Sequence, residues 1–455
     1  MRDPAATIEF EPNWVVRRAH EGHQNHQFLK TELAQRLVSD GNLISFEWID
    51  ETTIRAPRLP FVTFPEEWTA SQLHSAAKLT LQIQSQANAA GWDLKDASAW
   101  NIVFDGLRPV FVDLLSFQPL STKMWQAGDQ FSRQFILPLL LEKKGLIKIT
   151  EIFKIWRDGI PPNVAAKIIG PMRYFSRYSP LMMRASRRKS NSYGFAETYN
   201  EFMGPNDYFD KKASHDTFSQ RRRINTALNW MVDGVDPQYE KRSTQWSNYE
   251  DCRNHYKSGH VQFKKSVVSE WIKEINPNWV LDVGCNAGEF SNIAVMHGAK
   301  VICWDSDQGA LNKLFGRYEN NSQSGQYHII SADIDDISGG RGWMGSEFPG
   351  LFERLYQKAD LVLLLAISHH LYVSSSIPLS QIFSFFYNVT RKNIILELIS
   401  HNDVRVRELC HRFNRNPSEF TIQKQIDAAT KSGFIVKDRK KFREIDEREL
   451  IWLSK

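Results

Sequence analysis

One β-loop-α unit is predicted by the run Val280-Leu281-Asp282-Val283-Gly284-Cys285-Asn286-Ala287-Gly288-Glu289-Phe290-Ser291. The first four residues of this run are mostly apolar and β-branched, which favours a short buried strand. Gly284 and Gly288 permit a positive φ or a close backbone approach, and apolar residues recur at helical spacing from Phe290 onward. In such a unit, the loop amides and the helix N-terminus face a ligand that lies across the carboxyl ends of the strands.

The spacing of this loop argues against a dinucleotide. Asn286 stands where G-x-G-x-x-G would need a glycine, and Asp282 precedes the first glycine. A carboxylate at that place repels a pyrophosphate but attracts a ligand that carries an ammonium group. A second expected strand, 301–305, ends at Asp305, where a carboxylate can accept hydrogen bonds from a ribose diol. The glycine loop and the two acids together favour a ligand site over a merely structural turn.

The segment 280–291 resembles motif I of the class I methyltransferases that use S-adenosylmethionine (SAM). This resemblance implies a Rossmann-like domain and SAM as the cofactor, with no metal ion. An acid after the third strand, or the backbone that follows it, would meet the adenine amine. The implied cofactor-binding residues are Asp282, Gly284, Cys285, Asn286, Gly288, Asp305 and Asp333.

Strands and helices continue to alternate on both sides of this unit. A helix over 263–275 leads into the first strand, and another is expected over 308–317. The run 359–366 is continuously apolar, as a parallel strand buried on both faces requires. The other expected strands are 327–333, 393–398, 433–436 and 449–453. The resulting total of seven strands suits the methyltransferase sheet, so we expect an α/β domain over 245–455.

Two histidines follow the fourth expected strand. Methyl transfer to an alcohol or phenol requires removal of a proton, and a histidine has a suitable pKa for this role. His369 and His370 are therefore candidate catalytic bases, although a structural or cofactor-facing role for the pair fits equally well. The Asn/Asp-Pro-Pro-Tyr signature of base N-methylation is absent here, which argues against adenine or cytosine as the acceptor.

The N-terminal part, 1–183, is expected to be an α+β domain. Short strands over 1–65 precede a helix at 71–90, which Gly91 closes. Helices follow over 124–183, with a break at Pro161-Pro162. Their apolar face comprises Trp125, Phe131, Phe135, Ile136, Leu139 and Leu140. Residues 184–244 are interpreted as a linker and helical connection, after which Trp246 and Tyr249 either cover the cofactor or pack the domain junction.

A fragment of this N-terminal part resembles the catalytic loop and metal-binding aspartate of kinase-like folds. Asp96, Asn101 and Asp113 have the spacing that positions a hydroxyl and binds magnesium in kinases. The chain before Asp96 has no glycine-rich loop and no evident phosphate-binding lysine. A remnant or a structural use of the hairpin is therefore favoured over phosphotransfer.

Composition sets further bounds. A chain of 455 residues with 42% hydrophobic content is expected to form two or three domains. The formal charge of +5 is a mild excess, and nucleic acid is not favoured as a partner. The four cysteines form no C-x-x-C pair, which fits a reducing cytoplasm. The longest apolar run, 361–367, is far shorter than the ~20 residues of a bilayer span, so no membrane insertion is expected. No pattern specifies an oligomeric state.

The whole chain is similar to the nodulation-protein NoeA-like family of methyltransferases. The matching stretches are 64–68, 91–97, 109–117, 280–291, 365–371 and 377–379. This resemblance implies the cofactor but not the acceptor. The favoured function is methyl transfer to oxygen of a small molecule or glycan. The alternatives are a SAM-binding regulatory or interaction protein without catalysis and, less favoured, a phosphotransferase acting through the N-terminal region.

Overall fold

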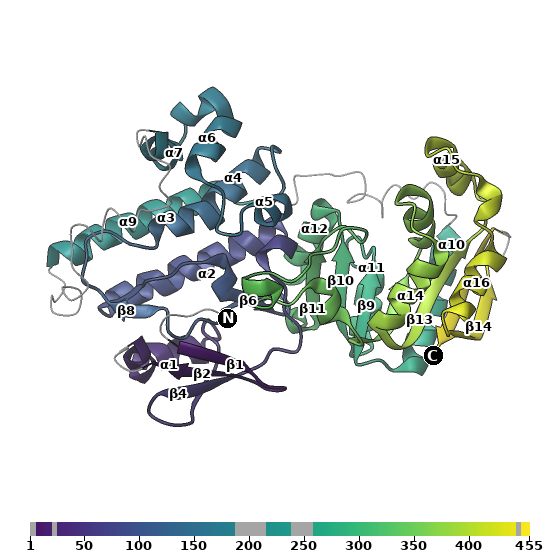
Figure 1. Ribbon diagram of the computed structural model, residues 1–455, viewed down its shortest axis with the longest axis horizontal. Helices are drawn as coiled ribbons and strands as arrows, with labels where there is room; N and C mark the ends of the chain where they lie inside the picture. Colours follow the sequence, from purple (N-terminus) through teal and green to yellow (C-terminus); the bar gives the residue numbers. More distant parts are fainter. Residues whose placement is uncertain (1–5, 21–24, 187–214, 238–257, 443–446) are drawn as a thin grey trace. The chain divides into compact units, whose positions relative to one another are not determined.

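The computed structural model describes residues 6–20, 25–186, 215–237, 258–442 and 447–455. The chain divides into two units, 1–238 and 239–455, and each is described by itself (Figure 1). Trp246 and Tyr249 lie outside the described residues, as does most of the connection expected over 184–244.

The first unit begins with a four-stranded antiparallel sheet of order β1-β2-β4-β3. Its strands are β1 (Ala6–Phe10), β2 (Trp14–Ala19), β3 (Glu47–Trp48) and β4 (Thr53–Pro57). A 3₁₀ turn (Asn25–Lys30) and the helix α1 (Glu32–Ser39) interrupt it, and the sequence pattern had not indicated this helix. The hydroxyl of Thr31 caps α1 by accepting the Ala34 N–H.

The helix α2 (Ala70–Ala89) confirms the helix expected over 71–90. It begins with a capping box, in which the Thr69 hydroxyl accepts the Gln72 N–H and the Gln72 side chain accepts the Thr69 N–H. Gly91 follows the helix with a φ of 80°, a conformation that favours glycine. Two short antiparallel pairs come next, β5 (Trp92–Leu94) with β8 (Phe117–Pro119) and β6 (Ile102–Asp105) with β7 (Arg108–Phe111).

The helices expected over 124–183 are present. They are α3 (Gly128–Phe131), a π-helical turn (Ser132–Ile136), α4 (Leu137–Lys143), α5 (Ile149–Ile155), α6 (Pro162–Ile169) and α7 (Ser179–Ser186). All six residues of the predicted apolar face are buried, which confirms that face. The predicted break is also confirmed, because Pro161 caps α6 and Pro162 is its first residue.

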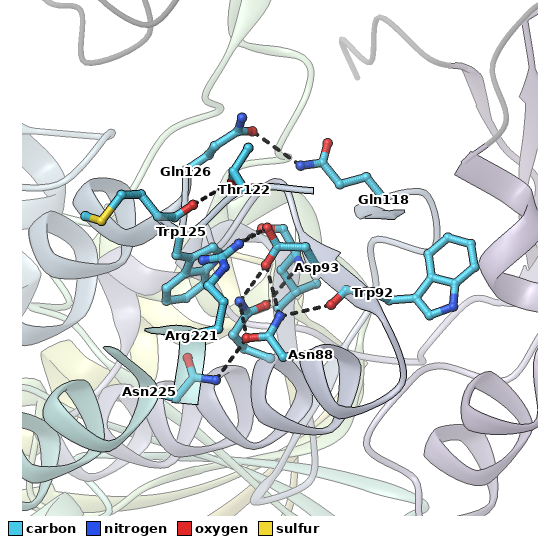
Figure 2. A network of polar contacts seen from close by, with 12 residues as sticks. Asn88, Trp92, Asp93, Gln118, Thr122, Trp125, Gln126, Arg221 and Asn225 are labelled. Atoms are coloured by element: carbon cyan, nitrogen blue, oxygen red, sulfur yellow. Dashed lines mark hydrogen bonds and ion pairs between the residues drawn. The ribbon is translucent and has the colours of Figure 1, made fainter. Parts of the chain in front are cut away.

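The helix α9 (His215–Gly234) packs against α2 in the first unit through a buried polar network (Figure 2). Arg221 pairs with Asp93, and both side chains are almost completely buried. Gln84 Nε2 and Asn88 Nδ2 donate to Asp93 Oδ1 at 2.7 and 3.2 Å. Asn225 Nδ2 donates to Asn88 Oδ1 at 3.0 Å. Burial raises the pKa of Asp93, and Arg221 opposes that effect.

The second unit contains a seven-stranded sheet of order β11-β10-β9-β12-β13-β15-β14. Neighbours from β11 to β13 are parallel, whereas β15 is antiparallel to both β13 and β14. The strands are β9 (Trp279–Val283), β10 (Lys300–Asp305), β11 (Tyr327–Ser331), β12 (Ala359–Leu364), β13 (Thr390–Ile399), β14 (Ile435–Lys441) and β15 (Arg448–Ser454). The α/β class is confirmed.

Helices accompany this sheet. They are α10 (Ser258–Ile275), α11 (Glu289–Met296), α12 (Gln308–Tyr318), α13 (Leu351–Leu355), α14 (Leu379–Val389), α15 (Val404–Arg412) and α16 (Ile422–Lys431). The strand order reverses between β9 and β12, because β10 and β11 lie on one side of β9 and the later strands on the other. At such a switch point, parallel sheets bind ligands at the carboxyl ends of their strands.

Several strand boundaries differ from the sequence prediction, those of β11 and β14 among them. The strand β11 ends at Ser331, so Asp333 lies in the loop beyond it. The strand β14 starts at Ile435 and continues to Lys441 through a charged stretch that no hydrophobic pattern marks. It lies at the sheet edge, where charged residues are typical because they discourage pairing with other chains.

Among the described residues, no helix is long and apolar enough to cross a membrane.

Candidate functional site

A cavity of about 860 Å³ opens at the carboxyl ends of the parallel strands in the second unit. Residues at or just after the ends of β9, β10, β11 and β12 line one part of it. Residues of α15 and the first residue of β15, Arg448, line another part. Its size falls within the range of ligand pockets, about 300–1,000 Å³. The cavity therefore coincides with the switch point of the sheet.

The loop after β9 has a conformation that its glycines make possible. Gly284, Asn286 and Gly288 have φ values of 69°, 53° and 83°. A Cβ at Gly284 would lie 2.2 Å from Ile367 Cδ1, and one at Gly288 would lie 2.6 Å from Leu314 Cδ1. Both the positive φ and the lack of space for a side chain therefore favour glycine at these two positions.

Asp305 connects the end of β10 to this loop. Its carboxylate accepts the Asn286 N–H at 2.8 Å through one oxygen and the Asp307 N–H at 2.8 Å through the other. The side chain also lines the cavity, and burial raises its pKa, while the two backbone donors oppose the shift. The structure therefore brings Asp305 and the glycine loop together on one cavity wall.

Asp282 is buried beneath the loop, with only 2% of its surface exposed. The Ser291 hydroxyl donates to Asp282 Oδ2 at 2.6 Å. Burial raises the pKa of Asp282 to about 6, against the opposing effects of Ser291 and Lys264. This carboxyl group is therefore mostly ionised at pH 7 and takes up a proton as the pH falls through about 6.

The other predicted cofactor residues occupy the same cavity wall. Cys285 and Asn286 follow Gly284, and Asp333 is an exposed side chain beyond β11. Burial raises the pKa of the Cys285 thiol, which therefore behaves as a neutral wall group. All seven predicted positions except Gly288 line the cavity, and Gly288 caps α11 next to it.

His369 and His370 lie on the cavity wall, a few residues after the end of β12, where the chain turns into a π-helical segment (His370–Ser374). His369 is 7% exposed, and its buried Nδ1 has no hydrogen-bond partner among the residues that the structure describes. Burial, with His370 and Arg448 nearby, lowers the pKa of His369 well below its usual value. Burial also lowers the pKa of His370, whose ring centre lies 4.2 Å from that of His369. Both imidazoles are therefore neutral near pH 7 and have a nitrogen lone pair that can accept a proton.

A group of charged residues on this wall was not predicted. Lys264 and Arg448 line the cavity, and both pair with the fully buried Glu397 at 2.6 and 3.0 Å. Burial would raise the pKa of Glu397, but these two cations bring it below its usual value. Arg405 and Arg412 of α15 add two further cations. Lys264, Glu397 and Arg448 lie far apart in the sequence, so no local pattern could have predicted their pairing.

The kinase-like residues are engaged in local hydrogen bonds in the first unit. Asp96 Oδ1 accepts the Ser98 N–H at 2.9 Å, and Asp113 Oδ1 accepts the Leu115 N–H at 3.3 Å. The Asn101 carbonyl accepts the Val112 N–H at 2.8 Å, which brings Asn101 beside Asp113. Across the part of the chain that the structure describes, no three His, Cys, Asp or Glu residues group closely enough to hold a metal ion.

Comparison with solved structures finds partial similarity to methyltransferases. The magnesium protoporphyrin IX methyltransferase ChlM from Synechocystis PCC 6803 with bound SAH is 15% identical, with a TM-score of 0.32, over 43% of this chain and 83% of that one. The N-methyltransferase NodS from Bradyrhizobium japonicum WM9 is 11% identical, with a TM-score of 0.31, over 43% and 97%. The bifunctional kinase-methyltransferase WbdD is 16% identical, with a TM-score of 0.30, over 44% and 40%.

Among curated proteins, the chain is similar to the nodulation protein NoeA of Rhizobium meliloti (strain 1021). The two are 28% identical over 428 residues, which is 90% of this chain and 86% of that protein. No protein-family model matches the chain.

Proposed function

We propose that the second unit binds SAM and transfers its methyl group to an oxygen of a small molecule or glycan. The observation that carries this proposal is a single cavity, at the switch point of the sheet, that is lined by Asp282, Asp305 and His369. Two acids beside a glycine loop suit a ligand with a ribose and a positive charge. A neutral imidazole on the same wall suits removal of a proton from an acceptor hydroxyl.

The chemistry of the cavity wall fits this cofactor. In the proposal, Asp305 binds the ribose hydroxyls and the loop over Gly284 to Gly288 approaches the cofactor closely. Asp282 provides the negative charge that attracts the ammonium group, and Asp333 or its backbone meets the adenine. When bound, SAM supplies an electrophilic methyl group on a positively charged sulfur. The chain's own contribution is to hold the acceptor oxygen in line with that methyl group, which is the larger source of rate in a displacement.

His369 is the better candidate for the base. Its buried Nδ1 finds no hydrogen-bond partner in the described part of the chain, whereas His370 is less deeply buried. Its low pKa keeps it neutral, which leaves it available to accept a proton but makes it a weaker base than an ordinary histidine. The proposed role is to hold the acceptor hydroxyl and accept its proton as the new bond forms.

The proposed function is tested by incubating the full chain with labelled SAM and a panel of hydroxylated small molecules and oligosaccharides. Appearance of label in an acceptor, with stoichiometric formation of the demethylated cofactor, would support methyl transfer. Binding of SAM without transfer to any acceptor would favour a SAM-binding regulatory protein instead. Labelling of nitrogen rather than oxygen in the product would contradict the proposed acceptor atom.

Replacing Asp305 with alanine should weaken SAM binding about 10- to 100-fold, because two charge-assisted hydrogen bonds to the ribose are lost. The change also removes the acceptor for the Asn286 N–H, so the loop itself loses support. Calorimetric titration of the full chain with SAM measures the affinity. The matched control is Asp427→Ala, which removes an exposed carboxylate bonded only to Gln423 within α16. Equal SAM affinity for Asp305→Ala and the parent protein would show that the ribose assignment is wrong.

SAM affinity should also depend on pH through Asp282. Its pKa is raised to about 6 in the protein without ligand, and a bound cation favours its ionised form. Protons therefore compete with the ligand below pH 6, and affinity should fall as pH decreases from 6 to 5 but change little between 7 and 8. Calorimetry across this range tests the expectation. In Asp282→Asn, affinity should be lower and the pH dependence largely lost. An unchanged pH dependence in that variant would assign the effect to another group.

A further inference from the structure

The cavity has an uneven distribution of charge on the two sides of the switch point. Acidic side chains lie at or beyond the carboxyl ends of β9, β10 and β11, namely Asp282, Asp305, Asp333 and Asp335. The side formed by α15 and β15 instead presents Arg405, Arg412 and Arg448, with Glu408 as the acid among them. The acidic side complements the positive charge of SAM in the proposed function. The other side must then meet the acceptor.

One face of α15 accounts for most of this basic side. Arg405, Glu408, Leu409 and Arg412 all line the cavity, and their spacing of three, four and seven residues places them on a single helical face. Arg405 Nη1 donates to Glu408 Oε2 at 2.8 Å, so that pair is nearly neutral. Arg412 has no ion-pair partner among the described residues. It is thus the cation on this face whose charge is not offset.

The deeper cations have their charges offset within the protein. Lys264 pairs with Glu397 at 2.6 Å. Arg448 pairs with Glu397 at 3.0 Å and with Asp403 at 2.9 Å. Because carboxylates already offset their charges, these two cations attract a further anion less strongly. Arg412, at the last turn of α15, is better suited to bind an anion that enters the cavity from outside.

We infer that the methyl acceptor carries an anionic oxygen group, a carboxylate or a phosphate, that binds Arg412 with support from Arg405. This inference rests on the proposed function and names the chemistry of its acceptor. Guanidinium groups bind both of these anions through paired N–H donors, which gives orientation as well as attraction. Such an anchor at α15 would leave the acceptor hydroxyl free to face His369 on the same cavity wall. The alternative is that Arg412 is an ordinary solvated surface charge.

The test uses the full chain saturated with S-adenosylhomocysteine, so that the cofactor side is filled. Inorganic phosphate and succinate are titrated separately at constant ionic strength and followed by calorimetry. We expect at least one of them to bind in the millimolar range, and Arg412→Gln to weaken that binding about tenfold or more. Arg412→Lys should keep part of the affinity, because it retains the charge but not the paired donors. The affinity for S-adenosylhomocysteine should be the same in all of these proteins.

The matched control is Arg407→Gln, which removes an exposed arginine from the same helix but not from the cavity wall. Binding of phosphate alone would identify a phosphoryl group in the acceptor, and binding of succinate alone a carboxylate. The inference is overturned if neither anion binds in the millimolar range, if Arg412→Gln binds as the parent does, or if Arg407→Gln loses as much affinity. Failure of the parent to bind S-adenosylhomocysteine would instead overturn the proposed function.

Discussion

Replacing His369 with glutamine should lower methyl-transfer turnover by about 10²- to 10⁴-fold, the range expected for loss of a general base. SAM affinity should change little, because the side chain is expected to act on the acceptor and not on the cofactor. Glutamine is similar in size to histidine and keeps a polar group in the cavity wall, so the fold of the turn after β12 should survive. Turnover is measured with an acceptor found in the labelled-SAM screen, and SAM binding is followed in parallel.

Measurements of SAM affinity and thermal stability, beside the pH profile, separate this role from a structural one. The pKa of His369 lies well below its usual value because of burial, so turnover of the parent at saturating SAM should stay flat down to well below pH 6.5. The matched control is His370→Gln, which changes the neighbouring ring and should lower turnover much less. Unchanged turnover in His369→Gln would refute the base assignment and leave alignment of the acceptor as the main source of rate. A parallel loss of SAM affinity and thermal stability would indicate a structural histidine.

Replacing Arg221 with methionine should destabilise the first unit by about 3–5 kcal/mol, because it leaves the buried carboxylate of Asp93 without its cation. Burial already raises the pKa of Asp93 while Arg221 is present, and removal of the arginine would raise it further. This polar network joins α2 and α9, so the loss of Arg221 should weaken the contact between the two helices (Figure 2). Hydrogen exchange in peptides from α2 and α9 measures this unit separately, since a chain with two units need not unfold in one step.

Two further variants make the result specific to the buried pair. Arg222→Met removes the neighbouring exposed arginine of α9 and should change stability by no more than about 0.5 kcal/mol. Adding Asp93→Asn to Arg221→Met removes the unpaired charge but keeps an oxygen that accepts from Gln84 and Asn88, so much of the stability should return. A small effect of Arg221→Met, or no recovery in the double variant, would contradict the assignment of the destabilisation to the charge of Asp93.

Several features of the second unit could be predicted because their causes are local. The apolar runs mark each buried strand from β9 to β13, since a strand covered on both faces needs no alternation. Gly284 and Gly288 identify the loop because the chain must adopt positive φ there. Asp305 was identified from its place at the end of a predicted strand, and parallel strands bring their carboxyl ends to one edge. The strands, the glycine loop and its acids could therefore be predicted from residues that are close together in the sequence.

The tertiary structure decided which distant residues share a site. Lys264, Glu397 and Arg448 come from α10, β13 and β15, and their ion pairs exist only because the sheet places those elements together. The same is true of Asp93 and Arg221, which are joined across the first unit by the packing of α9 on α2. In the second unit, the packing of α15 places Arg412 on the cavity wall. The sequence alone thus determined the strands, the glycine loop and its acids through short-range backbone preferences. Long-range packing determined the charges that surround them, because pairing between distant side chains leaves no periodic trace in the chain.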